Sequence, residues 1–237
     1  APDSDNLTVN RINGSTYLLN ANIATSHGTV RVTNPNGAYT YIPNAGYTGA
    51  DSFTYTISDG NGGSSTATVY LSVIGVNEIS VNEGSPYAVF EVSGVANEQV
   101  TLSLANGTAT MDSNGIPLQD GSEDFGPVLE YSTDGGANWS TYSSTAVALN
   151  GSGRLLVRTA VIHDALYEGA HTFRLRATNI DSTFADGTAT IRDDGTGQWF
   201  DGTGGTGSST APNGQVLDDD RPLTVNDIRV NEGSPFA

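Results

Sequence analysis

The stretch SFTYTISDGNGGSSTATVYLSV, residues 52–73, alternates apolar and polar side chains on both sides of a glycine-rich turn. Its two runs, 52–58 and 66–73, are rich in Thr, Val, Tyr and Phe, which favour extended backbone. Between them, Asp59-Gly60 readily adopts positive φ, as turns require. The pattern therefore predicts two strands joined by a turn.

The same pattern extends along the rest of the chain, where helical periodicity is hard to find. Dipeptides that favour turns separate the alternating runs. We therefore expect an all-β chain built from two tandem β-sandwiches. The further runs are 87–92, 100–104, 154–162 and 172–178, and the further turn dipeptides are Asn36-Gly37, Asn106-Gly107, Asp134-Gly135 and Asp186-Gly187.

One segment occurs twice: NEISVNEGSPYA at 77–88 and NDIRVNEGSPFA at 226–237. The two copies begin 149 residues apart, a domain-sized period that is much longer than a solenoid repeat. This indicates a piece of a long modular protein whose main partners are neighbouring domains of the same chain. We expect a monomer that can exchange a strand through residues 226–237, because an edge strand can pair with another chain.

The strand pattern divides the chain into three parts. Residues 1–76 form a first domain, and residues 77–197 form a second domain that starts at the repeated motif. Residues 198–237 combine a Gly/Ser-rich loop or linker with the first strand of a following repeat. The apolar pair Trp199-Phe200 within that stretch is expected to dock at the junction between repeats.

Composition restricts the partners of the chain. It has 26 acidic residues against nine Arg and no Lys, and its formal net charge is −17. Such charge repels itself unless cations neutralise it, and nine scattered Arg make nucleic acid and anionic membranes poor partners. The chain has no Cys for disulfides or thiolate metal sites, and no apolar run approaches the ~18 residues of a membrane span. Bound Ca²⁺ is therefore the expected stabilising ligand.

Residues 77 to about 197 resemble the Calx-beta domain of sodium–calcium exchangers and many large bacterial surface proteins. The matching pieces are VNEG at 81–84, GTAT at 107–110, Asp124-Phe125, HDALYEG at 163–169 and GTATIRDDG at 187–195. The resemblance implies a seven-stranded immunoglobulin-like sandwich that binds Ca²⁺ through loops at one end.

Residues 27–74, including HGTVRV and GADSFTYTISDGNGG, resemble the cadherin-like repeats of bacterial adhesins. A chain that combines this unit with a Calx-beta-like domain is similar to the large RTX-type surface adhesins. That similarity implies an extracellular location on the bacterial cell surface.

The Calx-beta resemblance implies metal ligands at the ends of several strands. Ca²⁺ takes six to eight oxygen ligands, and the strand ends of a sandwich converge at its poles. Ordinary solvated acids are the alternative. The expected ligands are Glu83, Asp124, Asp164, Glu168, Asp193 and Asp194.

A second group of acids, Asp51, Asp59 and Glu78, flanks a strand of the first domain or lies in the short linker. Ca²⁺ bound there would make the connection between the two domains rigid. The alternative is that Asp51 and Asp59 cap turns by accepting backbone hydrogen bonds.

The segment MDSNGIPLQDGSE, residues 111–123, departs from the Calx-beta pattern by separating GTAT from the acid-aromatic pair. Its acids could enlarge a calcium cluster, build a ligand pocket, or sit in a tolerated surface insertion. Trp139 in a hairpin-like segment could stack on a sugar or a peptide. A peptide- or glycan-binding module using Asp112, Asp120 and Trp139 is thus the alternative function.

An enzyme is not expected, because neither GxSxG nor HExxH occurs around His27, His163 or His171. Zinc held by His163, His171 and neighbouring acids competes with the interpretation that these are surface histidines. The sequence therefore favours a non-enzymatic, calcium-dependent extender segment of a large bacterial adhesin.

Overall fold

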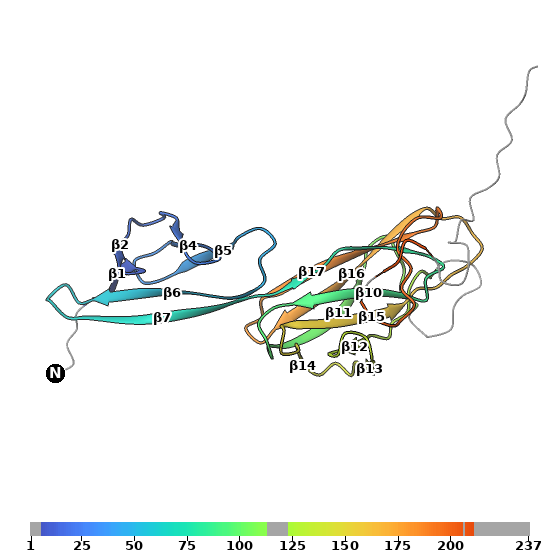
Figure 1. Ribbon diagram of the computed structural model, residues 1–237. Helices are drawn as coiled ribbons and strands as arrows, with labels where there is room; N and C mark the ends of the chain where they lie inside the picture. The colour runs from blue at the N-terminus through green and yellow to red at the C-terminus, as the bar shows by residue number, and fades with distance from the viewer. Residues whose placement is uncertain (1–5, 113–122, 206, 211–237) are drawn as a thin grey trace, which may run out of the picture.

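A computed structural model describes residues 6–112, 123–205 and 207–210. These residues form two β-sandwiches joined end to end, and no helix occurs among them (Figure 1). The prediction of an all-β chain with two tandem immunoglobulin-like or cadherin-like sandwiches is confirmed. Within the described ranges, nothing helical is long and apolar enough to cross a membrane.

The first sandwich packs a four-stranded sheet, in the order β2-β1-β6-β7, against a three-stranded sheet, β3-β4-β5. Alternation along β6 places Phe53 in a small core with Ile12, Val30 and Val32. The sheets contain β1 (Thr8–Ile12), β2 (Ser15–Thr16), β6 (Gly49–Ser58) and β7 (Ser64–Val73), and β3 (Ile23–Ala24), β4 (Gly28–Val32) and β5 (Tyr39–Pro43).

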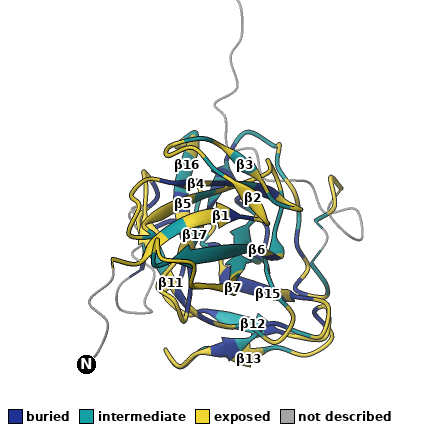
Figure 2. Ribbon diagram, turned by 90° about the vertical axis from the view of Figure 1, so that its left-hand side faces the viewer, coloured by how far each residue is buried: buried dark blue, intermediate teal, exposed yellow. Residues whose placement is uncertain are grey.

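The second sandwich packs two five-stranded sheets, in the orders β13-β12-β15-β10-β8 and β14-β11-β16-β17-β9. Buried side chains of both sheets form one larger core, and the buried positions are dark blue in Figure 2. The strands are β8 (Gly75–Val76), β9 (Ile79–Asn82), β10 (Tyr87–Ser93), β11 (Gln99–Asn106), β12 (Glu130–Ser132), β13 (Ser140–Thr141), β14 (Val147–Ala148), β15 (Arg154–Ala160), β16 (Ala170–Asn179) and β17 (Phe184–Arg192).

Residues 75–82, which run into the repeated motif 77–88, form one edge of this sandwich and are divided between its two sheets. β8 pairs with β10 in one sheet, whereas β9 pairs in parallel with β17 in the other. Because β9 and β17 run in the same direction, both end at the same end of the sandwich. We call this end the distal pole, and we call the end with β8 and residues 95–98, which adjoins the first sandwich, the proximal pole (Figure 1).

The residues after β17 correct the expectation of a loop or linker from residue 198 onward. The backbone N–H of Gln198 donates to the carbonyl of Ser80, and the N–H of Asn82 donates to the carbonyl of Gln198. Phe200 is buried in the second core, and its N–H donates to Ser85 Oγ. Residues 198–200 therefore belong to the second sandwich, and Phe200 docks in its core, because burying Phe200 outweighs the flexibility of the glycines around it.

Phe173 lies at the centre of the second core. Its ring stacks on Phe125 with a centroid distance of 4.1 Å and meets Phe90 edge-on at 5.8 Å. All three rings are fully buried. Such contacts add to the hydrophobic gain from burial.

We expect Phe173→Ala to lower the free energy of unfolding of the second sandwich by about 3–5 kcal/mol, because it leaves a cavity in a closed core. Urea denaturation followed by tryptophan fluorescence measures this unit selectively, since both tryptophans, Trp139 and Trp199, lie in it. The matched control, Phe184→Ala, removes an exposed ring stacked on Arg176 and should cost less than about 1 kcal/mol. Equal losses in both variants would contradict this description of the core.

Candidate metal centre

Buried carboxylates collect at the distal pole of the second sandwich. They come from segments far apart in the chain: the end of β9, the loop after β11 and the end of β17. The N–H of Glu83 donates to the Arg192 carbonyl, which joins the ends of β9 and β17, and the N–H of Asp112 donates to the Phe125 carbonyl, which closes the loop after β11. The described acids of this pole with less than one-tenth of their surface exposed are Glu83, Asp112, Glu123, Asp124 and Asp193.

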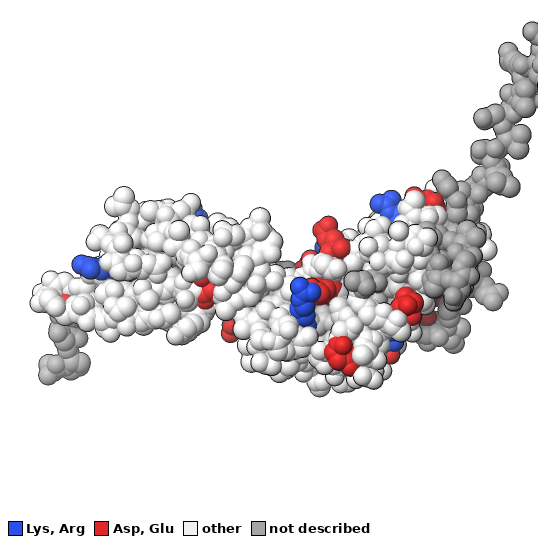
Figure 3. Space-filling model, viewed as in Figure 1, with Lys and Arg blue, Asp and Glu red and all other residues white. Residues whose placement is uncertain are grey.

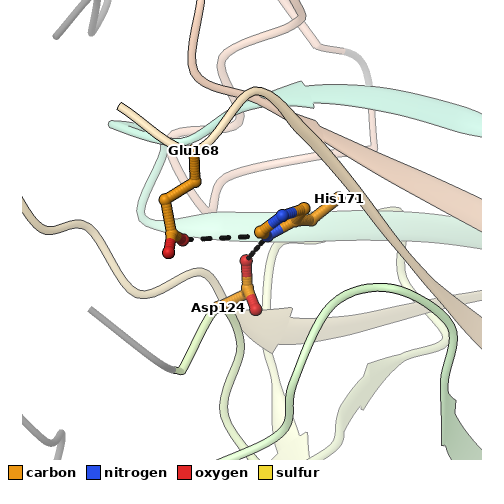
Figure 4. A group of neighbouring side chains, drawn as sticks. All are labelled: Asp124, Glu168 and His171. Carbon is orange, nitrogen blue, oxygen red and sulfur yellow. Dashed lines mark hydrogen bonds and ion pairs between the residues drawn. The ribbon is translucent and has the colours of Figure 1, made fainter. Parts of the chain in front are cut away.

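Asp124, Glu168 and His171 bring one ligand atom each to within 4.8 Å of one another (Figure 4). His171 Nδ1 lies 2.5 Å from Asp124 Oδ1 and 3.7 Å from Glu168 Oε2. The second oxygen of Asp124 accepts the backbone N–H of Thr110. The group is thus assembled from β16, the turn before it and the segment before Phe125.

Asp193 supplies the observation that points to a cation. Only 1% of its surface is exposed. Its Oδ2 accepts the backbone N–H of Glu168 at 2.7 Å, whereas its Oδ1 has no hydrogen-bond partner among the described residues. A buried carboxylate oxygen without a donor is costly, and a hard cation such as Ca²⁺ satisfies such an oxygen. The residues at this pole therefore fit a calcium site.

The electrostatics of the distal pole also favour a bound cation. Burial raises the pKa of Glu168, and repulsion from Asp124, Asp164 and Asp193 raises it further, while His171 opposes the shift. The arginine ion pairs of the described chain involve other acids, namely Glu91 with Arg154, Glu130 with Arg158 and Asp186 with Arg176. The pole therefore holds negative charge at a cost that a bound cation would remove.

The structure brings together five of the six acids predicted at this pole: Glu83, Asp124, Asp164, Glu168 and Asp193. The N–H of Asp164 donates to Glu83 Oε1 at 3.1 Å. The sixth, Asp194, is half-buried, and its Oδ1 accepts from the N–H and the hydroxyl of Thr196, as in a turn cap. Metal binding by these residues stays a prediction.

The inserted segment contributes to the same pole through its two described ends. Asp112, predicted as a ligand-binding residue, and Glu123, named only as an acid of the insertion, are both buried there. Asp120 lies outside the described residues. From the sequence, His171 was expected only as a zinc ligand or a surface residue, although its position two residues after the YEG turn indicated a place at this pole.

The second predicted group of acids is not brought together. Asp51 is buried in the first sandwich, Asp59 lies in the turn at the far end of the β6–β7 hairpin, and Glu78 is exposed at the start of β9. Asp59 Oδ1 accepts the N–H groups of Asn61 and Gly63, which is the turn-capping alternative.

Four donors occupy the two oxygens of Asp51. Its Oδ2 accepts from the Thr25 hydroxyl at 2.5 Å, the Tyr41 hydroxyl at 2.7 Å and the His27 N–H at 3.1 Å, and its Oδ1 accepts from the Ser52 N–H. Burial raises the pKa of Asp51, but these hydrogen bonds outweigh burial and lower it to about 2. Burial, together with the bond to Asp51, raises the pKa of Tyr41 to about 12. Asp51 therefore acts as a hydrogen-bond hub that fastens β6 to the opposite sheet.

Trp139, the predicted ligand-binding aromatic, packs against a buried arginine. The Arg158 guanidinium lies 4.1 Å from the Trp139 ring and 3.9 Å from the Tyr87 ring. Arg158 also pairs with Glu130 at 2.7 Å and donates to the Gly202 carbonyl at 2.7 Å. One face of Trp139 is thus occupied in fastening the segment after β17 to the sandwich.

Comparison with known proteins identifies the leading unit. Residues 1–75 match the bacterial cadherin-like domain family. The predicted resemblance of residues 27–74 is confirmed by this match, and we call the first sandwich the cadherin-like unit from here on. No curated protein matches the chain.

Three solved structures are similar to the chain at low identity. The crystal structure of the apo-form Calx CBD1 domain is 17% identical and covers 51% of this chain and 97% of its own, with a TM-score of 0.33. The crystal structure of CBD12 from CALX1.2 is 16% identical and covers 51% and 45%, with a TM-score of 0.33. The D00-D0 domain of intimin is 14% identical and covers 70% and 78%, with a TM-score of 0.31.

We expect Asp51→Asn to destabilise the cadherin-like unit by about 1–3 kcal/mol at neutral pH, because it removes a charge that four donors stabilise. The folded pKa of about 2 lies below the usual 3.8, so this stabilisation exists above about pH 4 and disappears as the pH falls through about 2. The difference in the free energy of unfolding between the parent and the variant should therefore disappear as the pH falls from about 4 to about 2. Urea denaturation followed by the amide NMR signals of β4 and β6 measures it, and a gap that persists at pH 2 would contradict the assignment.

Proposed function

We propose that this chain is a non-enzymatic structural segment of a large bacterial surface adhesin, located outside the cell, and that Ca²⁺ bound at the distal pole stiffens it. The observation that carries the proposal is Asp193 Oδ1, which is buried without a donor among other carboxylates. The bacterial cadherin-like match of residues 1–75 supports the adhesin setting. The main partners are then neighbouring domains of the same long chain.

The charge of the whole chain supports the same conclusion. A net charge of −17 without a single Lys leaves few internal cations to balance 26 acids. On the face shown in Figure 3, acidic side chains are spread over the second sandwich, whereas the cadherin-like unit presents few charges. A segment that works at millimolar calcium can obtain its missing positive charge from solution.

The carboxylates of Asp124, Glu168 and Asp193 are the residues that would hold the ion, and Glu83 and Asp164 lie beside them. Bound Ca²⁺ would supply positive charge and a cross-link. The chain's own residues determine what is cross-linked: Asp193 follows β17, Glu168 precedes β16, and Asp124 adjoins the core residue Phe125. Fixing these three points together would order the distal pole.

The alternative function is a peptide- or glycan-binding module that uses the 111–123 insertion. It is favoured by the burial of Asp112 and Glu123, which ties both described ends of the insertion to the acidic pole. Under this alternative the ion would also position the inserted loop. Loss of ligand binding on deletion of residues 113–122, with calcium binding retained, would favour it over the purely structural role.

Asp193→Asn provides the sharpest test. In millimolar calcium we expect calcium affinity to fall at least about tenfold, which corresponds to about 1.4 kcal/mol. In EDTA the same variant should be as stable as the parent or more stable, because it removes one of several repelling charges. Isothermal titration calorimetry measures the affinity, and thermal melts in EDTA, calcium and magnesium measure the stability.

Glu78→Gln is the matched control, because it removes an equal charge from an exposed site away from the pole. It should leave both the affinity and the calcium-dependent rise in melting temperature unchanged. If Asp193→Asn destabilises the protein equally in EDTA and in calcium, Asp193 has a purely structural role. If the parent shows no calcium-selective shift, the proposal fails.

A further inference from the structure

The two sandwiches are connected without a free linker residue. β7 ends at Val73 and β8 begins at Gly75, so only Ile74 separates the last strand of the cadherin-like unit from the first strand of the second sandwich. Ile74 is 9% exposed and belongs to the core of the second sandwich. The chain therefore passes from one unit into the other as nearly continuous extended backbone.

A carboxylate at the proximal pole fastens this connection from the side. Glu98 Oε1 accepts the Ser72 hydroxyl at 2.6 Å and the Asn179 side-chain amide at 3.1 Å, and Glu98 Oε2 accepts the Val95 N–H at 3.0 Å. Asn179 ends β16, and Val95 lies in the loop after β10. A side chain of the cadherin-like unit is thus held by an acid that the second sandwich fixes on both oxygens.

Gly75 marks a close approach of the two units. A Cβ atom at this position would lie 2.6 Å from Thr48 Cγ2 of the cadherin-like unit and 3.4 Å from Ser93 Oγ of the second sandwich. The side chains of Thr48 and Ser93 therefore close on the backbone of Gly75, and a larger residue would push them apart. This packing leaves little room for bending at the joint.

We infer that the joint between the cadherin-like unit and the second sandwich is fixed by these contacts and needs no bound metal. Each side of the joint is held by hydrogen bonds or packing that need no cation. Of the three acids expected to bind an ion here, Asp51 is bound by four donors, Asp59 lies at the far end of its hairpin, and Glu78 is exposed just before β9 without being brought near either of them. The inference does not rest on the proposed function.

The second copy of the repeated motif lacks the residues that this joint uses. At the same offset of 149 residues, Pro222 stands in place of Val73 and Thr224 in place of Gly75. Proline has no backbone N–H to donate, and threonine has the side chain that the Gly75 position cannot hold without a shift. The residues before the second copy of the motif therefore do not reproduce the sequence of this joint.

A distance measurement across the joint tests the inference on the whole chain. The chain contains no cysteine, so Thr68→Cys and Ala137→Cys place one spin label on an exposed position of each unit. Pulsed electron spin resonance should give one narrow distance distribution, with the same mean and width in EDTA and in millimolar calcium. A broad distribution in EDTA that narrows when calcium is added would overturn the inference.

Three changes in the doubly labelled chain show which contacts hold the joint. Two glycines inserted after Val73 should broaden the distribution in both buffers. Ser72→Ala, which removes the hydroxyl bound by Glu98, should broaden it less, and Ser65→Ala, an exposed serine on the same strand, should leave it unchanged. If the glycine insertion leaves the width unchanged, the contacts do not fix the joint. None of these results requires calcium binding. The proposed calcium site at the distal pole and the metal-free joint can therefore fail separately.

Discussion

The second sandwich depends on one constraint, which is that it holds several negatively charged carboxylates close together and away from water. Opposing strand ends bring Glu83, Asp124 and Asp193 to one pole, and burial there removes the water that would screen them. A buried carboxylate is tolerated only when donors or cations surround it. An acid whose oxygens are all bound by donors therefore stabilises the fold, whereas an acid with an oxygen that lacks a donor is available to a ligand.

Asp51 and Asp193 show that separation most clearly, because both are nearly fully buried aspartates close to a strand. All the hydrogen bonds that Asp51 can readily accept come from its own unit, so its negative charge stabilises the fold. Asp193 receives one backbone hydrogen bond, and its other oxygen accepts none from the residues that the structure describes. Asp51 is therefore complete as a structural element, whereas no described residue gives Asp193 a positive partner.

Much of this architecture could be predicted from the sequence. Period-two alternation identified the main strands, because a half-buried strand must show one face to the core. The gathering of Glu83, Asp124, Glu168 and Asp193 was expected from the Calx-beta resemblance, and the convergence of strand ends at a pole explains it. The role of Asp51 could not be predicted, because its donors at Thr25 and Tyr41 lie on the opposite sheet. The docking of Phe200 was missed because local glycine content hid a single long-range core contact.

The parallel pairing of β9 with β17 has a mechanical consequence. The chain enters the second sandwich at the proximal pole, and β17 ends at the distal pole, where Gln198 and the buried Phe200 hold the following segment to the same edge. Tension along the chain therefore acts lengthwise on these two strands. Their four paired positions, from Ile79 with Ala189 to Asn82 with Arg192, then resist in shear and must break together. Antiparallel strands pulled from a shared end would instead unzip one bond at a time. The edge where the repeated motif joins the sheet is therefore the part of the sandwich that withstands pulling.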